Sequence, residues 1–239
     1  MNLNEQYRAW LHMRRPDVVH YASGEDVPMD ADAARLGRDK ASHRGIGKRT
    51  ALRELAASSV NQDFLEEIGQ LTGLEYLELG YPVTATDLRP LTAIKSLRHL
   101  TMDSPRAITD FTPLLELPAL ERLFIENARH LTSLDWLRPL KGRLKALGIE
   151  GSLWTKQRIP TLKPLEGFDL EALFLTGTSL DDQDLSPIAT MPNIKFLGTA
   201  INAPRSQFEA LHRAKPELEC DWFDPQAWVG MNDPKPPKR

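Results

Sequence analysis

The side chains that could support catalysis or bind a metal are spread along the whole sequence. The six histidines stand at positions 12, 20, 43, 99, 130 and 212, and no two of them have the spacing of a metal-binding pair. Catalysis needs several such groups converging on one point. Cys220, the single cysteine, is better interpreted as a buried residue than as a nucleophile. The sequence therefore predicts no enzyme, no metal site and no cofactor.

The segment Gly45–Thr50, GIGKRT, has the residue types of a phosphate-binding loop but not its spacing. Such a loop needs a glycine five positions before its Gly-Lys pair and Ser or Thr directly after it. Those positions hold Ser42 and Arg49. We interpret the segment as a flexible connection that leads into a first strand within residues 50–57.

A leucine pattern that recurs along the chain predicts the elements that would carry any binding residues. In the stretch Leu71–Gly80 the leucines stand at 74, 77 and 79. The copies begin with the apolar residues Leu74, Leu97, Leu120, Leu144, Leu170 and Ile194. The spacings between consecutive members of this series are 23, 23, 24, 26 and 24 residues. A repeat of this length predicts a solenoid. Between the copies, D-x-x-P motifs begin at Asp87, Asp110 and Asp184, and they predict short helical or 3-10 turns.

The combination L-x-x-L-x-L followed by D-x-x-P-L resembles the bacterial leucine-rich repeat family, and most closely the short repeats of internalins. The resemblance covers about residues 50–222. It implies a solenoid with a parallel sheet on its concave side and helical or 3-10 turns on its convex side. It also implies protein binding without catalysis, although the partners of this family are diverse. The asparagine that usually follows each strand in the family is present only at Asn202.

We predict three regions along the chain: an N-terminal helical cap at 1–47, repeats with a closing strand at 48–222, and a disordered tail at 223–239. The cap prediction rests on an apolar helix face and on a weaker helix over residues 30–40. The residues of that apolar face are Leu3, Tyr7, Trp10 and Leu11. The longer repeat spacings predict a bulge around 135–169. Glu217–Trp222 is predicted as the closing strand, and the prolines that follow it suggest disorder.

The composition of the chain argues against some classes of binding partner. The net charge of -3 and the pI of about 6.1 argue against nucleic acid. No apolar run is long enough to span a membrane, and Glu5 and Arg8 interrupt the place of a signal peptide. We therefore expect a cytoplasmic protein, with secretion by a leaderless route left open.

Side chains alternate along a strand, so positions 2, 3 and 5 of each repeat should point outward on the concave face. Position 2 alternates in charge through Arg53, Glu75, Arg98, Glu121, Lys145, Glu171 and Lys195. Opposite charges on neighbouring strands stabilise a sheet. We interpret this column as a charge ladder that holds the strand register.

Positions 3 and 5 and the nearby rim carry the residues that we predict to bind a partner. They are Tyr76, Glu78, Tyr81, His99, Asp103, Arg122, Phe124, Glu126, Phe174 and Phe196. Outward aromatic groups commonly mark an interaction site, and Tyr and Arg are enriched in binding hot spots. We predict a protein partner, with an inhibitor or immunity protein as the sharper hypothesis. The alternatives are a homodimer in which a second copy covers the aromatics, and a terminal segment that folds over them.

Overall fold

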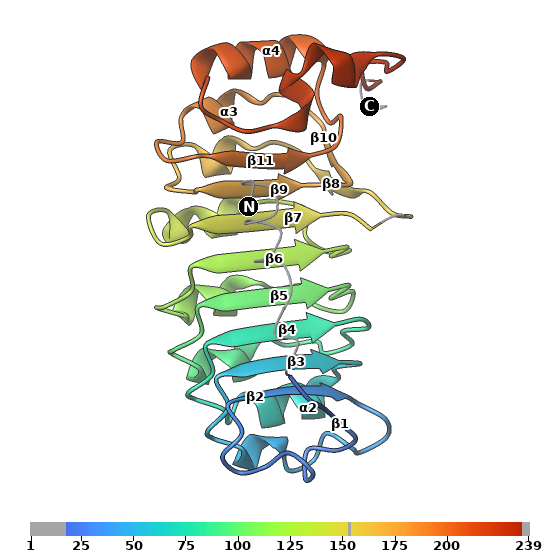
Figure 1. Cartoon of the computed structure of the whole chain (residues 1–239), viewed down its shortest axis with the longest axis vertical. Coiled ribbons are helices and arrows are strands. Elements are labelled where there is room, and N and C mark those ends of the chain that lie inside the picture. Colours follow the sequence, from blue (N-terminus) through green and yellow to red (C-terminus); the bar gives the residue numbers. More distant parts are fainter. Residues whose placement is uncertain (1–17, 153, 236–239) are drawn as a thin grey trace. The chain divides into compact units, whose positions relative to one another are not determined.

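The computed structural model describes residues 18–152 and 154–235. The chain divides into two compact units, which within the described residues are 18–130 and 131–235. Each unit consists of parallel strands connected by short helices and 3-10 turns (Figure 1). This is the alternation that the leucine pattern predicted.

The first unit contains six parallel strands, hydrogen-bonded in chain order. They are β1 (His20–Tyr21), β2 (Ala33–Gly37), β3 (Glu54–Ser58), β4 (Tyr76–Gly80), β5 (His99–Asp103) and β6 (Arg122–Glu126). The register places Leu77 beside Leu55 and Leu100. All three leucines are fully buried, so the predicted inward positions form the core.

The return segments of the first unit are η1 (Ile46–Lys48), α2 (Gln62–Ile68), η2 (Arg89–Ala93) and η3 (Thr112–Glu116). The last two follow the predicted D-x-x-P signature. Asp87 Oδ1 accepts a 2.9 Å hydrogen bond from the amide of Arg89, and Asp110 Oδ1 accepts one of the same length from Thr112. Proline occupies the first turn of both η2 and η3, where its missing donor leaves no intrahelical bond unmade.

The second unit contains a sheet formed by β7 (Ala146–Glu150), β9 (Ala172–Leu175) and β11 (Phe196–Thr199). A separate parallel pair joins β8 (Gln157–Ile159) to β10 (Thr178–Leu180). The returns are η4 (Asp135–Leu140), η5 (Lys163–Leu165), α3 (Ser186–Ala189) and α4 (Arg205–Ala214). The inserted β8 strand accounts for the longest repeat spacing, and it lies within residues 135–169, where a bulge was predicted.

The helix predicted over residues 30–40 is wrong, because Ala33–Gly37 forms β2. Ala34 and Leu36 are buried and pair in register with Leu55 and Ala57. Pairing with β3 outweighs the local helix preference of this alanine-containing segment. The helix predicted from Leu3 to Leu11 lies outside the described residues.

Two predictions for the C-terminal region also change. The closing strand is reduced to one bridge between Phe196 and Glu219, followed by η6 (Asp221–Phe223) and η7 (Pro225–Trp228). The predicted disorder is wrong at Trp228, which is only 8% exposed and whose ring centroid lies 5.6 Å from that of Phe208. Burial of this aromatic side chain orders a segment that its prolines alone suggested would be disordered. Residues 236–239 lie outside the described part.

Candidate partner-binding surface

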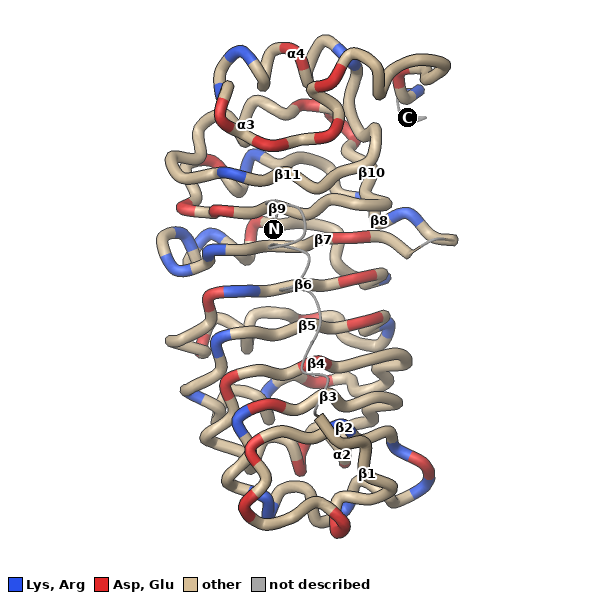
Figure 2. Tube along the Cα trace, viewed as in Figure 1, with Lys and Arg blue, Asp and Glu red and all other residues tan. Residues whose placement is uncertain are grey.

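The charge ladder forms within each unit. In the first unit the ion pairs are Arg53–Glu75 at 4.0 Å and Arg98–Glu121 at 3.0 Å, and charges of both signs lie at the strand starts (Figure 2). In the second unit Lys195 pairs with Glu171 at 3.0 Å, whereas Lys145 pairs with Asp169. Such half-exposed pairs contribute about 0–1 kcal/mol each. The ladder therefore supports strand register and leaves little net charge for a ligand.

An aromatic row crosses the outer face of the first unit, the face that carries strand positions 3 and 5. Tyr76 on β4, His99 on β5 and Phe124 on β6 form this row. The ring centroids of Tyr76 and His99 lie 4.4 Å apart, and those of His99 and Phe124 lie 5.4 Å apart. His99 Nε2 lies 3.1 Å from Thr101 Oγ1. The structure thus brings these three predicted binding residues together.

The aromatic row is buried, although its residues occupy outward positions. His99 and Phe124 are each 3% exposed, and Tyr76 is half-buried. Burial raises the pKa of Tyr76 above its ordinary value, and the nearby carboxylates of Glu78 and Glu54 raise it further. The aromatic patch that the sequence predicts to be open is therefore largely buried.

The outer face of the second unit carries a similar aromatic pair. Phe174 on β9 is fully buried and Phe196 on β11 is 3% exposed, with their ring centroids 5.3 Å apart. Register places Gly148 and Gly198 beside Phe174. A Cβ added at Gly198 would lie 3.0 Å from ring carbons of both phenylalanines. The small residues at position 5 of the neighbouring strands thus make room for the two rings.

The remaining predicted residues are more accessible. Tyr81, directly after β4, is 60% exposed. Asp103, Arg122, Glu126 and Glu78 are partly exposed. Tyr81 is the predicted aromatic residue that is most available to another molecule.

A pocket of about 380 Å³ lies on the outer face of the first unit, among β1 to β4. His20, Arg35, Ser58 and Glu78 contribute its polar lining. Glu78 was predicted from the repeat pattern, whereas His20 and Arg35 were missed because their strands were interpreted as part of a helical cap. Two further copies of the strand pattern, an eighth and a ninth, sought upstream of residue 50, would have been the signal for them.

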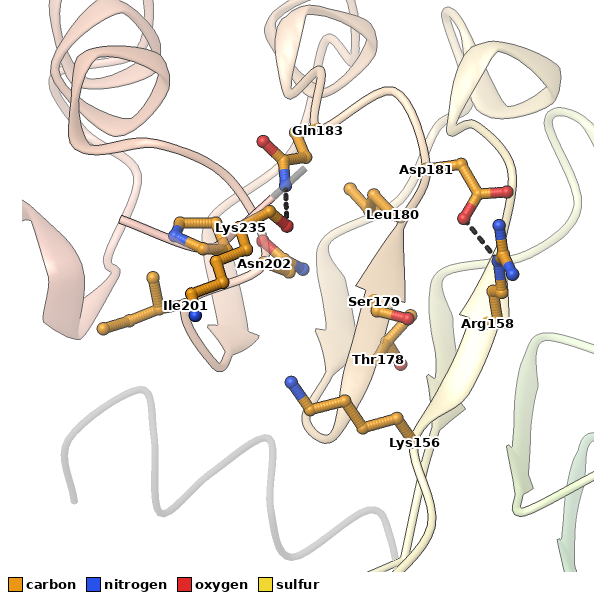
Figure 3. Close-up of a pocket in the computed structure, with 11 residues that line it drawn as sticks. Lys156, Arg158, Thr178, Ser179, Leu180, Asp181, Gln183, Ile201, Asn202 and Lys235 are labelled. Carbon is orange, nitrogen blue, oxygen red and sulfur yellow. Dashed lines mark hydrogen bonds and ion pairs between the residues drawn. The ribbon is translucent and has the colours of Figure 1, made fainter. Parts of the chain in front are cut away.

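A second pocket, of about 430 Å³, lies in the second unit beside β8 and β10 (Figure 3). Arg158 pairs with Asp181 at 2.6 Å, and the side chain of Gln183 donates to the carbonyl of Lys235 at 3.1 Å. Lys156 and Ser179 also line it. No histidine lies among the lining residues to activate the serine hydroxyl. The repeat pattern does not predict this pocket, because the pocket depends on the inserted strand β8.

Neither a metal-binding group nor a membrane-spanning helix is found in the part of the chain that the structure describes. Within residues 18–152 and 154–235 no three histidine, cysteine, aspartate or glutamate side chains are grouped to hold a metal ion. Over the same ranges no helix has the length and apolar character needed to cross a bilayer.

Cys220 is 8% exposed, and burial raises the pKa of its thiol to about 12. Because the thiolate is the reactive form, we expect a thiol reagent at pH 8 to label the native chain at least about tenfold more slowly than the urea-unfolded chain. Because the pKa of the thiol is higher in the folded chain than in the unfolded one, its contribution to folding stability is fully present below pH 9. That contribution is lost as the pH rises from 9 towards 12. Equal labelling rates for native and unfolded chain would contradict the burial.

Comparison with solved structures identifies the fold of the chain. An internalin (InlF) of Listeria monocytogenes aligns with a TM-score of 0.58 and 21% identity, over 78% of this chain and 52% of its own. The fold is a leucine-rich repeat solenoid. An internalin C2 of the same species aligns with a TM-score of 0.45 and 22% identity, over 65% of this chain and 67% of its own.

A leucine-rich repeat protein of Leptospira interrogans aligns with a TM-score of 0.48 and 16% identity, over 91% of this chain and 56% of its own. No protein-family model matches the sequence, and no curated protein matches it. This chain spans about half the length of InlF. At these identities the likeness concerns the fold and not the partner.

Proposed function

We propose that this chain is a non-catalytic protein-binding module whose partner contacts the outer face of the first unit. The observation that carries the proposal is the 60% exposed side chain of Tyr81, next to Gly80 in the lining of the 380 Å³ pocket. Tyrosine offers a large, rigid contact area at low entropic cost, and it is enriched among residues that dominate binding energy.

The chemistry of the pocket suits a polar side chain of a protein partner. Arg35 and Glu78 supply opposite charges, and His20 and Ser58 add groups that both donate and accept hydrogen bonds. Asp103 is the last residue of β5 and Glu126 is the last residue of β6. Both were predicted to bind a partner, and they extend the polar surface. A contact centred on Tyr81 with a polar surround has the layout of a small binding hot spot.

The form of binding module that we favour is an inhibitor or immunity protein that covers an enzyme or toxin. We place it in the cytoplasm because a lone, buried thiol suits a reducing compartment. The homodimer alternative requires aromatic side chains that are free to pair with a second copy. Phe124, Phe174 and Phe196 are buried within a single chain, so no observation favours that alternative.

Replacing Tyr81 by alanine is expected to weaken partner binding at least about tenfold, because loss of a hot-spot side chain costs more than about 1.4 kcal/mol. The purified chain is used as bait, a captured protein is identified and purified, and its Kd is measured by calorimetry. Trp154→Ala is the matched control, because Trp154 is 92% exposed but belongs to the second unit. A partner that binds both variants as tightly as the unchanged chain would place its contact elsewhere.

A further inference from the structure

The pocket of about 430 Å³ in the second unit has an excess of positive charge. Its charged lining residues are Lys156, Arg158, Asp181 and Lys235, so three cations stand against one carboxylate. The chain as a whole has the opposite sign, with a net charge of -3. The positive charge is therefore local to this pocket, and an anion is the kind of ligand that it would attract.

The two lysines are the cations that a ligand could use. The charge of Arg158 is partly compensated, because its guanidinium group pairs with Asp181 at 2.6 Å. Within residues 18–152 and 154–235, neither Lys156 nor Lys235 forms an ion pair. In Figure 3 the side chain of Lys156 extends from β8 towards Ile201, and the side chain of Lys235 ends close to Ile201. Both ammonium groups are thus available to one anion in the pocket.

The pairing of β8 with β10 sets one wall of the pocket. In this register Ser179 lies beside Arg158. Thr178 and Ile159, the next residues along the two strands, are buried. Because side chains alternate along a strand, Ser179 and Arg158 point away from the core and into the lining. The wall therefore offers a hydroxyl group next to a guanidinium group.

Two hydrogen bonds hold the segment that carries Lys235. The side chain of Gln183 donates to the carbonyl of Lys235 at 3.1 Å. Two residues earlier, Asp233 Oδ1 accepts a 2.8 Å hydrogen bond from the amide of Arg205, the first residue of α4. The backbone at Lys235 is thus tied to the repeats on both sides of the pocket.

Asn202 adds a buried acceptor to the lining. It is 3% exposed, and its Nδ2 donates to Thr199 Oγ1 at 2.9 Å. The hydroxyl of Thr199 donates to the carbonyl of Ala200, so towards Asn202 it can only accept, and this fixes the orientation of the amide. Asn202 Oδ1 has no hydrogen-bond partner among the described residues. Because an unpaired buried acceptor is costly, a donor group on a ligand would be favoured here.

We propose that this pocket binds a small organic phosphate, whose phosphoryl group contacts Lys156 and Lys235 and whose hydroxyl group donates to Asn202. A phosphate monoester carries a charge of about −1.5 to −2 at pH 7. This charge matches the excess of positive charge in the lining, whereas a monocarboxylate would leave one cation uncompensated. The ammonium group of lysine is a compact point charge that suits phosphate. The volume also lies within the range of about 300–1,000 Å³ that is usual for small-molecule sites.

Calorimetric titration of the full chain with glucose 6-phosphate, at about pH 7.5 and low ionic strength, tests the proposal. We expect saturable binding with a Kd below about 1 mM. Glucose, which lacks the phosphoryl group, should not bind. Phenyl phosphate, which has no hydroxyl group outside its phosphate, should bind at least about fivefold more weakly than glucose 6-phosphate.

Two results of the titrations would overturn the proposal. The first is the absence of saturable binding of glucose 6-phosphate up to about 10 mM. The second is binding of inorganic phosphate as tight as that of glucose 6-phosphate, because the site would then recognise an anion and no organic part.

Variants place the ligand in the pocket. Lys156→Gln and Lys235→Gln should each weaken glucose 6-phosphate binding at least about fivefold, because each removes one charge-assisted contact. Lys163→Gln is the matched control, since Lys163 is also an exposed lysine of the second unit but lies in η5, outside the pocket lining. Its Kd should stay within about twofold of that of the unchanged chain. Circular dichroism checks that each variant keeps its fold.

Equal affinities for the unchanged chain and the two pocket variants would place the phosphate elsewhere and overturn the proposal. A loss as large in Lys163→Gln as in the pocket variants would also overturn it, because binding would then follow only the total charge. The proposal does not depend on the protein partner of the first unit. Failure to find that partner would count against the proposed function only.

Discussion

Replacing Phe174 by alanine is expected to lower the free energy of unfolding by about 3–5 kcal/mol, the cost of truncating a fully buried phenylalanine. The position lies on the outer face of the sheet. If the side chain were exposed to solvent there, the substitution would change the free energy of unfolding very little. The ring packs against Phe196 and the backbone at Gly198, so its removal leaves a cavity between them. Urea unfolding followed by circular dichroism measures the change.

Tyr81→Ala is the matched control for this substitution. It also truncates an aromatic side chain at the outer face, but that side chain is 60% exposed. Its removal should change the free energy of unfolding by no more than about 0.5 kcal/mol. A loss below about 1 kcal/mol for Phe174→Ala would show that the outer face of the second unit is open in solution.

Replacing Leu77 by alanine is expected to cost about 2–5 kcal/mol, because this side chain is fully buried in the leucine core of the first unit. Leu55 and Leu100 flank it on the neighbouring strands. Repeats in a solenoid contact chiefly their neighbours. The loss should therefore appear first as faster amide hydrogen exchange in β3, β4 and β5, measured by mass spectrometry.

Glu75→Ala provides the control for the leucine substitution two residues away. Glu75 is exposed and lies 4.0 Å from Arg53, so its removal should cost less than about 1 kcal/mol. Exchange in β3 to β5 should then stay close to that of the unchanged chain. Equal effects of the two substitutions would contradict the assignment of Leu77 to the core and of Glu75 to the charge ladder.

The leucine series and the D-x-x-P motifs determined the solenoid, because both signals are local and repeat with a fixed period. Leu77 and Leu79 point inward wherever the strand is paired, since alternation along a strand is a property of the backbone. Asp87 and Asp110 accept from amides two residues away, so their effect does not depend on the rest of the fold. The charge ladder follows from the same period. Lys145 departs from it, because its ion pair is with Asp169 and not with a position-2 carboxylate of a neighbouring strand.

Contacts between residues far apart in the sequence determine the features of the structure that the repeat pattern does not predict. Ala33–Gly37 forms a strand because β3 offers an edge to pair with, and the packing of Trp228 on Phe208 orders residues 225–228. The outward direction of Phe124 and Phe174 could be predicted from the leucine register alone. Their burial could not, because whether an outward side chain meets water or another segment of the chain depends on tertiary packing, which no local period records.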